Sequence, residues 1–205
     1  MTYLMVIFAA YLAGSIPSAI IVGKLWKGID VRQHGSGNIG ATNVFRVLGA
    51  GPGAVVLCLD ALKGVIGVYF GMVWLGGGWG PVLGGLIAVA GHNWPIWLSF
   101  KGGRGVATGL GVILMLVPKI TVIVTCVFAL VVYFTRYVSL GSIIAALSVP
   151  LLMLLFHETL PVLIFGLVAS SFVVIRHRAN IGRLLNGTEL KISWGKESSS
   201  DAEKR

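Results

Sequence analysis

The sequence predicts an all-α polytopic membrane protein, a bundle of about seven transmembrane helices with the N-terminus outside and the C-terminus in the cytoplasm. Three observations lead to this fold class. Of the 205 residues, 56% are hydrophobic and only 11% are charged, whereas a soluble domain carries about 25% charged residues. The mean hydropathy is +0.91. The basic residues are divided unevenly between the connecting segments, which sets an orientation across the membrane.

Apolar segments follow one another along the chain. A helix needs about 20 apolar residues to span a bilayer, or fewer where the bilayer thins or flanking residues snorkel. The fourth and fifth segments are short, so the alternatives are five or six spans. Seven is the preferred count. The segments cover residues 3–23, 53–75, 81–99, 105–117, 120–134, 139–156 and 160–175.

The orientation follows from the placement of Lys and Arg, which concentrate on the cytoplasmic side of membrane proteins. With seven spans and the N-terminus outside, the outer side carries only Lys119. The formal net charge of +9 is therefore attributed to cytoplasmic loops, and no nucleic acid partner is inferred. The cytoplasmic set is Lys24, Lys27, Arg32, Arg46, Lys63, Lys101, Arg104, Arg136, Arg176, Arg178, Arg183, Lys191, Lys196, Lys204 and Arg205.

The chain is predicted to form one transmembrane domain over residues 1–192. Residues 193–205 are polar and are predicted to form a disordered cytoplasmic tail.

The first of three polar motifs, GSGNIGATNVFR over residues 35–46, follows the first apolar segment. Glycines allow close approach of the backbone to a ligand, and backbone N–H groups beside a cation form an anion site. We therefore expect a phosphate or carboxylate site at a membrane face. A dinucleotide fold is not expected, because no soluble strand–helix–strand unit surrounds the glycines. A P-loop is not expected either, because Ala41 stands where its lysine belongs.

The second motif is FKGGRGVAT over residues 100–108, in which Lys101 and Arg104 flank Gly102 and Gly103. A helix is predicted to begin directly after it, and a helix N-terminus adds partial positive charge. Donors, charge and close backbone approach are what a phosphate monoester requires. The alternative is an ordinary basic turn on the cytoplasmic side.

The third motif, RHRANIGRLLNGTE over residues 176–189, lies at the end of the last span. In a helix, His177 and Asn180 are three residues apart and share a face, with Arg176 and Arg183 beside them. The alternative is a solvated basic helix end that contacts anionic lipid.

Polar residues inside the spans are interpreted as structural. Asp60 and Lys63, three residues apart, are expected to pair, and His92 is expected to be a satisfied histidine at a helix end. No aspartate stands five residues after any histidine, as in many glycerolipid acyltransferases, and no G-x-S-x-G elbow is present. No cluster of ligands suggests a metal.

Together the three motifs closely resemble those of the bacterial acyl-phosphate-dependent glycerol-3-phosphate acyltransferases, the PlsY family. The resemblance covers about residues 4–190 with the motifs in the family's order. Arg104 departs from the family's usual lysine but keeps the charge, so phosphate binding is expected to persist.

The resemblance implies a seven-span enzyme of the bacterial inner membrane, with its active site facing the cytoplasm. Such an enzyme transfers an acyl chain from acyl phosphate to the sn-1 hydroxyl of glycerol 3-phosphate, giving lysophosphatidic acid and phosphate in phospholipid biosynthesis. Acyl phosphate, glycerol 3-phosphate and membrane lipid are then the partners, with no cofactor. Oligomeric state is not predicted, and a monomer fits the sequence.

The resemblance also assigns roles to individual residues. It implies catalytic roles for Ser36, Arg46, His177 and Asn180, and a structural role for Glu189. Direct attack by the glycerol hydroxyl is the favoured mechanism, with a His177 general base or an acyl-Ser36 intermediate as alternatives. The competing hypothesis is a transporter for a phosphorylated anion, which would need a polar path to the outer side. The expected substrate-binding residues are Gly35, Gly37, Asn38, Asn43, Lys101, Gly102, Gly103 and Arg104.

Overall fold

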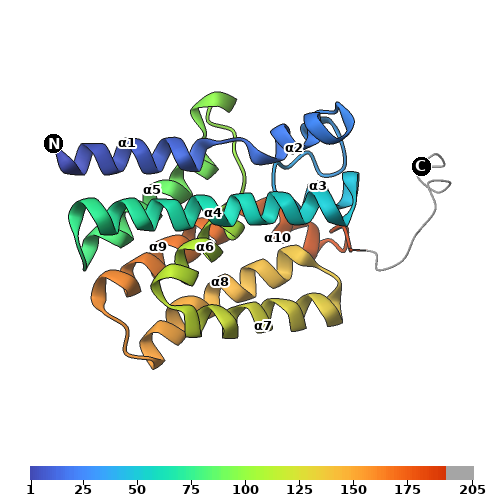
Figure 1. Cartoon of the computed structure of the whole chain (residues 1–205). Coiled ribbons are helices and arrows are strands. Elements are labelled where there is room, and N and C mark those ends of the chain that lie inside the picture. The colour runs from blue at the N-terminus through green and yellow to red at the C-terminus, as the bar shows by residue number, and fades with distance from the viewer. Residues whose placement is uncertain (193–205) are drawn as a thin grey trace, which may run out of the picture.

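The computed structural model describes residues 1–192, and its regular secondary structure there is entirely helical (Figure 1). The predicted tail, residues 193–205, lies outside the described residues. Two single turns, η1 (Val31–Gln33) and η2 (Ile96–Leu98), accompany the α-helices. These are α1 (Thr2–Ser15), α2 (Ser18–Lys27), α3 (Ala41–Leu48), α4 (Ala50–Leu75), α5 (Trp79–Asn93), α6 (Val106–Leu116), α7 (Pro118–Thr135), α8 (Val138–Leu155), α9 (Leu160–Arg176) and α10 (Arg178–Leu185).

The first predicted segment is not one continuous helix. α1 ends at Ser15 and α2 begins at Ser18, because Pro17 disfavours the helical conformation in the residue before it. Ile16 accordingly has a ψ of 123°. The apolar segment over residues 3–23 thus consists of two helices, and the whole stretch Thr2–Lys27 still counts as one candidate membrane span.

α4 is the helix against which the first half of the chain packs, contacting α1, α3, α5 and α6. Glycines allow these helices to approach backbone to backbone. A Cβ atom on Gly84 of α5 would overlap the carbonyl oxygen of Gly67 of α4, and one on Gly111 of α6 would overlap that of Ala61. This packing holds α5 and α6 close against the long α4 helix.

The third predicted segment, residues 81–99, ends earlier than expected. α5 stops at Asn93, because Trp94 precedes Pro95 and is kept out of the helical region. The chain then reverses through η2, with Ser99 and Phe100 at positive φ, and the second polar motif leads into α6. Proline chemistry, which a hydropathy window does not register, thus places this loop.

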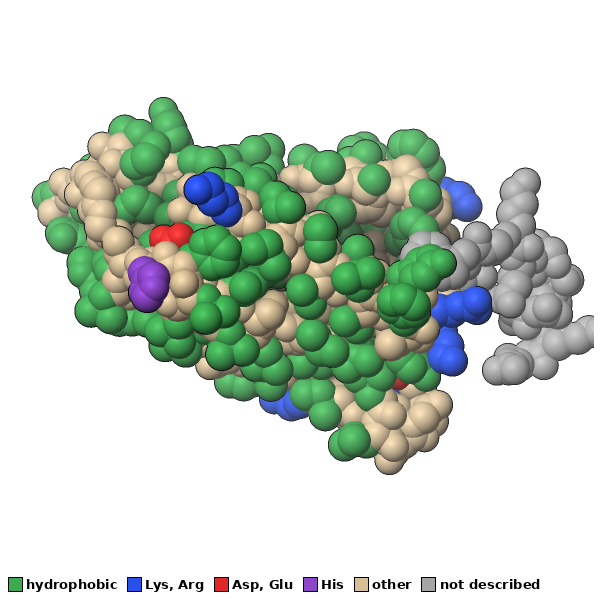
Figure 2. All heavy atoms as spheres, turned by 90° about the horizontal axis from the view of Figure 1, so that it is seen from below, with side chains coloured by type: hydrophobic (Ala, Val, Ile, Leu, Met, Phe, Trp, Pro, Cys, Tyr) green, Lys and Arg blue, Asp and Glu red, His purple; other side chains and the backbone are tan. Residues whose placement is uncertain are grey.

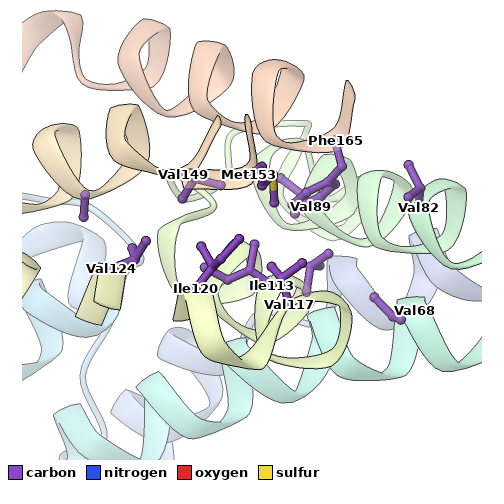
Figure 3. Packing of buried hydrophobic residues seen from close by; sticks show 12 residues of the cluster. Val68, Val82, Val89, Ile113, Val117, Ile120, Val124, Val149, Met153 and Phe165 are labelled. Atoms are coloured by element: carbon purple, nitrogen blue, oxygen red, sulfur yellow. The ribbon is translucent and has the colours of Figure 1, made fainter. Parts of the chain in front are cut away.

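The second half of the chain packs through an apolar cluster formed by α6, α7, α8 and α9, to which α4 adds Val68 and α5 adds Val82 and Val89. Figure 3 shows Val149 and Met153 of α8 close to Ile113 and Ile120 of α6 and α7. The fully buried members include Phe165, which α9 contributes. This cluster also contains residues that line an apolar cavity described below.

Four stretches of the described chain are long and apolar enough to cross a membrane: Thr2–Lys27, Ala50–Leu75, Pro118–Thr135 and Val138–Leu155. A fifth results if α9 and α10, which are bent by 57° at their junction, are counted as one. Hydrophobic side chains cover most of the face in Figure 2, and Lys and Arg gather at the end where α10 lies in Figure 1. The helical membrane character is confirmed, while seven spans and their orientation stay predictions because α5 and α6 have only 15 and 11 residues.

Candidate active site

A polar cavity of about 130 Å³ brings parts of all three motifs together. Ser36, Asn38, Asn43 and Arg46 of the first motif line it, as does Arg104 of the second. Gly35, Gly37, Lys101, Gly102 and Gly103 are not among its lining residues. The other lining residues are Gly40, Ala41, Thr42, Leu57, Asp60, His92, Gly105, Val106, Ala107, Phe128, Val138, Ser139, Ser142, His177, Asn180, Arg183, Glu189 and Leu190.

Asn43 holds the first motif in shape. The amide nitrogen Nδ2 donates to the carbonyl oxygens of Val31 and His34, at 2.9 and 3.1 Å. The amide oxygen Oδ1 accepts from the backbone nitrogen of Ser36 at 2.8 Å and from its hydroxyl at 3.1 Å. Asn43 is 1% exposed. Since buried amides of this kind are costly to leave unpaired, this side chain fixes the position of Ser36.

The glycines of the first motif serve the turn that presents Ser36. Gly35 and Gly37 both have positive φ, 60° and 68°, a conformation that strongly favours glycine. A Cβ atom on Gly35 would come within 2.5 Å of Asn43 Oδ1. These two glycines therefore shape the loop, while Ser36 and Asn38 reach the cavity.

Two arginines face the cavity without a carboxylate partner in residues 1–192. Arg46 donates from Nη2 to the carbonyl oxygen of Leu190 at 3.1 Å, and its Nε is buried without a partner. Burial lowers the pKa of Arg104 to about 10, because removal from water penalises the charged guanidinium. Partly buried cations without a salt-bridge partner favour an anionic ligand.

The second motif forms a loop in which the backbone N–H groups of the two central glycines are already bonded. The N–H of Gly102 donates to the carbonyl oxygen of Asn93, and the N–H of Gly103 donates to that of His92, both at 3.1 Å. Lys101 is exposed. Of the four residues that were expected to bind phosphate here, only Arg104 lines the cavity.

Arg176 holds this loop from the other side. Its guanidinium donates to the carbonyl oxygens of Gly102 and Gly103 at 2.7 to 3.0 Å, and it lies 5.9 Å from the ring centroid of Trp94. Sequence reasoning placed Arg176 beside His177 but did not indicate this function. The loop is thus fixed between α5 and α9, with Arg104 projecting into the cavity.

The third motif meets the cavity at the junction of α9 and α10. His177 is 2% exposed, and its Nδ1 lies 2.7 Å from the carbonyl oxygen of Val173. A carbonyl only accepts, so Nδ1 carries the proton and Nε2 is an acceptor. Asn180 donates from Nδ2 to Glu189 Oε1 at 2.6 Å, and its Oδ1 is buried without a partner.

Glu189 organises this part of the wall. Its carboxylate accepts from Ser139, Asn180 and Arg183 at 2.6 to 2.7 Å. Burial raises the pKa of Glu189, but these three hydrogen bonds outweigh it and lower the pKa below its ordinary value. The expected structural role agrees with this network, because Glu189 ties α8 to α10.

A buried ionic cluster adjoins the cavity on the α4 and α5 side. Lys63 Nζ lies 2.5 Å from Asp60 Oδ1, which confirms the expected pair, and His92 Nδ1 lies 3.7 Å from the same oxygen. Asp60 and His92 line the cavity, so the sequence interpretation missed that they border the site. Ser139 and Ser142 were also missed, because single serines in an apolar helix carry no motif.

An apolar cavity of about 220 Å³ continues from the polar one between α6, α7, α8 and α9. We call it the apolar slot. Its hydroxyl-bearing residues Thr125, Ser142 and Ser170 donate to backbone carbonyls, so the wall presents little free polarity. The two cavities share Leu57, Val106, Ala107, Phe128 and Ser142.

The combined space fits an amphiphilic molecule. Two guanidinium groups without a carboxylate partner in residues 1–192 can accommodate a phosphate. Neighbouring amide, imidazole and hydroxyl groups can accommodate polar atoms, and the slot can accommodate a hydrocarbon chain. The geometry suits group transfer between a phosphorylated, water-soluble molecule and a chain buried in the protein.

Comparison with known proteins gives consistent matches over nearly the whole chain. The family model described as glycerol-3-phosphate acyltransferase matches residues 4–187. A glycerol-3-phosphate acyltransferase of Desulforamulus reducens is 49% identical over 196 residues, which cover 95% of this chain and 98% of the relative. One from Bacillus subtilis is 44% identical over 190 residues, covering 93% and 97%.

Solved structures agree with these sequence matches. The crystal structure of PlsY (YgiH), an integral membrane glycerol 3-phosphate acyltransferase, in its glycerol 3-phosphate form has a TM-score of 0.89 and 40% identity, covering 94% of this chain and 96% of that one. Its lysophosphatidic acid form has a TM-score of 0.88 and 39% identity over the same shares.

Proposed function

The chain belongs to the glycerol-3-phosphate acyltransferase family, and we propose that it transfers the acyl group of an acyl phosphate to the sn-1 hydroxyl of glycerol 3-phosphate. The products are lysophosphatidic acid and inorganic phosphate. The observation that carries this proposal is the continuity of the polar cavity, with Arg46 and Arg104, and the apolar slot. A transporter for a phosphorylated anion has no comparable support from the relatives.

The phosphate groups of both substrates are assigned to the end of the polar cavity at which Arg46 and Arg104 lie. Charge-assisted hydrogen bonds from guanidinium to phosphate are among the strongest polar contacts in proteins. The acyl chain occupies the apolar slot, and its carbonyl carbon lies where the two cavities meet. We assign contacts with polar atoms of the substrates to four side chains that line the polar cavity: Ser36, Asn38, His177 and Asn180.

The chemical step is a direct displacement. The glycerol hydroxyl oxygen forms the new ester bond to the acyl carbon, the bond from that carbon to the phosphate oxygen breaks, and the hydroxyl proton passes to the departing phosphate. Positioning and charge neutralisation are then the main tasks of the protein. The hydrogen bonding of Ser36 supports this route over an acyl-serine: its hydroxyl donates to Asn43 Oδ1, whereas a serine nucleophile needs a base as its partner.

His177 is assigned a hydrogen-bonding role. Because its Nδ1 proton faces Val173 O, its Nε2 can accept a hydrogen bond from the glycerol hydroxyl and orient it.

We further propose that residues 1–192 span a bacterial inner membrane seven times, with the N-terminus outside and the site on the cytoplasmic side. Met1 and α10 lie at opposite ends of the bundle in Figure 1, which supports an odd number of crossings.

The test uses the purified full chain with palmitoyl phosphate and glycerol 3-phosphate. We expect lysophosphatidic acid and inorganic phosphate in equal amounts, and no product with palmitoyl coenzyme A as the donor. Product from the coenzyme A thioester but not from the acyl phosphate would contradict the proposed donor.

A further inference from the structure

Gly109 of α6 lines the apolar slot and has no packing partner. A Cβ atom built on it meets nothing within 4 Å, whereas one on Gly111, two residues further along α6, overlaps the carbonyl oxygen of Ala61. Gly111 is therefore explained by the contact between α6 and α4. Glycine weakens a helix relative to alanine, and neighbouring atoms do not require it at position 109.

Gly109 lies close to the entrance of the slot. Val106 and Ala107 line both cavities, and Gly109 follows Val106 by three residues, or about 5 Å along the helix axis. Ile113 lies deeper, about 10 Å from Val106 along the helix axis, and belongs to the same apolar cluster as Phe165 and Val149. A chain that passes from the polar cavity into the slot must cross the level of Gly109.

The remaining walls are fixed by packing and by internal hydrogen bonds. Phe165 is 1% exposed, and Ser170 of α9 is tied to the carbonyl oxygen of Ala146 of α8 at 2.5 Å. The space at Gly109 can therefore be changed by one side chain, without moving a neighbouring helix.

We propose that Gly109 determines which acyl chains the enzyme accepts. Its missing side chain provides the width through which a long acyl chain enters the slot. A larger residue at this position restricts the enzyme to donors whose acyl chains are too short to reach position 109. The inference rests on the proposed function, because it takes the slot to be the acyl site.

The experiment compares Gly109→Leu with the wild-type protein in lipid nanodiscs. Two ligands share a head group: 1-palmitoyl-glycerol 3-phosphate, which carries an acyl chain, and glycerol 3-phosphate, which does not. We expect the affinity for the palmitoyl ligand to fall about tenfold or more, since a mismatch of even one methylene in an apolar pocket has effects of about this size. The affinity for glycerol 3-phosphate stays within about twofold.

Gly51→Leu is the matched control. Gly51 lies in the first turn of α4 and is exposed, and a Cβ atom at this position also meets nothing within 4 Å, so it tests the same substitution away from the slot. We expect it to change neither affinity. Unchanged binding of the palmitoyl ligand by Gly109→Leu would overturn the proposal.

Gly109→Ala decides the case in which the leucine variant loses both ligands or does not fold. A selective loss of palmitoyl-ligand affinity, smaller than the tenfold value, supports the proposal, and an unchanged affinity overturns it. Turnover of palmitoyl phosphate by the wild-type protein tests the acyl-phosphate donor separately from the role of Gly109. If that turnover is absent while the selective binding loss is present, the donor assignment fails and the role of Gly109 persists. If the wild type does not bind the palmitoyl ligand, the role of Gly109 fails and turnover alone decides the donor assignment.

Discussion

The two glycine–cation motifs look alike in sequence but are used differently in the structure. In residues 35–46, the glycines form a turn and the side chains of Ser36 and Arg46 line the cavity. In residues 101–104, the glycine N–H groups are bonded to α5, and Arg104 is the residue that reaches the cavity. The difference teaches that a glycine pair can position a cation rather than bind the anion itself.

The largest effect is expected for Arg104→Ala. Removing a buried cation from its anionic partner costs about 3–5 kcal/mol, so kcat/KM for glycerol 3-phosphate should fall roughly a thousandfold. Arg104→Lys keeps the charge and should lose less than about tenfold. If kcat/KM of the alanine variant fell by less than tenfold, Arg104 would not be a phosphate-binding residue.

Ser36→Ala should lower kcat about a hundredfold and leave measurable turnover. This is the usual effect of deleting one hydrogen-bond donor near a reacting carbonyl. Within residues 1–192 the Ser36 hydroxyl donates to the amide oxygen of Asn43, which is not a base. Mass spectrometry of the wild-type protein quenched during turnover with palmitoyl phosphate provides the check. An acylated Ser36, together with complete loss of activity in the alanine variant, would establish the covalent route instead.

Gly103→Ala should raise KM for glycerol 3-phosphate about tenfold to a hundredfold, because a small displacement of a binding group has effects of this size. Its new Cβ atom would overlap Nε2 of His92 and shift the loop that carries Arg104. Gly51→Ala is the control, since its Cβ atom meets open space. Equal KM values for Gly103→Ala and the control would show that the loop does not position Arg104.

Much of the fold could be predicted from hydropathy, because long apolar segments have few alternatives in a membrane. The break at Pro17 and the early end of α5 depend on local proline sterics, which a composition window averages away. The site was predicted in part. Five residues that the motifs singled out line one cavity, while their roles stay predictions: Ser36, Arg46, Arg104, His177 and Asn180.

The missed features depend on partners that lie far away in the sequence. The N–H groups of Gly102 and Gly103 are bonded to main-chain oxygens of α5, and any residue type supplies a main-chain oxygen. Asp60 was correctly predicted to pair with Lys63, but its position beside the cavity depends on how α4 packs on α5. Such contacts leave no pattern in one sequence.

A pH effect should follow from Glu189. Its pKa is lowered in the folded protein, so its stabilising contribution is fully present above its unfolded pKa of about 4.3 and is lost as the pH falls through the folded value. Thermal unfolding of the wild-type protein should therefore show a loss of stability below about pH 4.3 that Glu189→Gln shows to a smaller extent. If the thermal stability of the two proteins fell identically with decreasing pH, Glu189 would not be the source of the acid sensitivity.

The smallest effect is expected for Lys101→Ala. Lys101 is exposed and does not line the cavity, and exposed charges contribute only about 0–1 kcal/mol. Its kcat/KM should therefore change by less than about fivefold. A loss as large as that of Arg104→Ala would show that both flanking cations of the second motif bind phosphate, and the contrast between the two motifs would disappear.

The most direct measurement is a crystal structure of this protein with bound 1-palmitoyl-glycerol 3-phosphate. We predict that the phosphate lies between the guanidinium groups of Arg46 and Arg104, with the palmitoyl chain running past Gly109 into the slot. A phosphate bound by the backbone of Gly102 and Gly103, or a chain lying outside the bundle, would contradict the account.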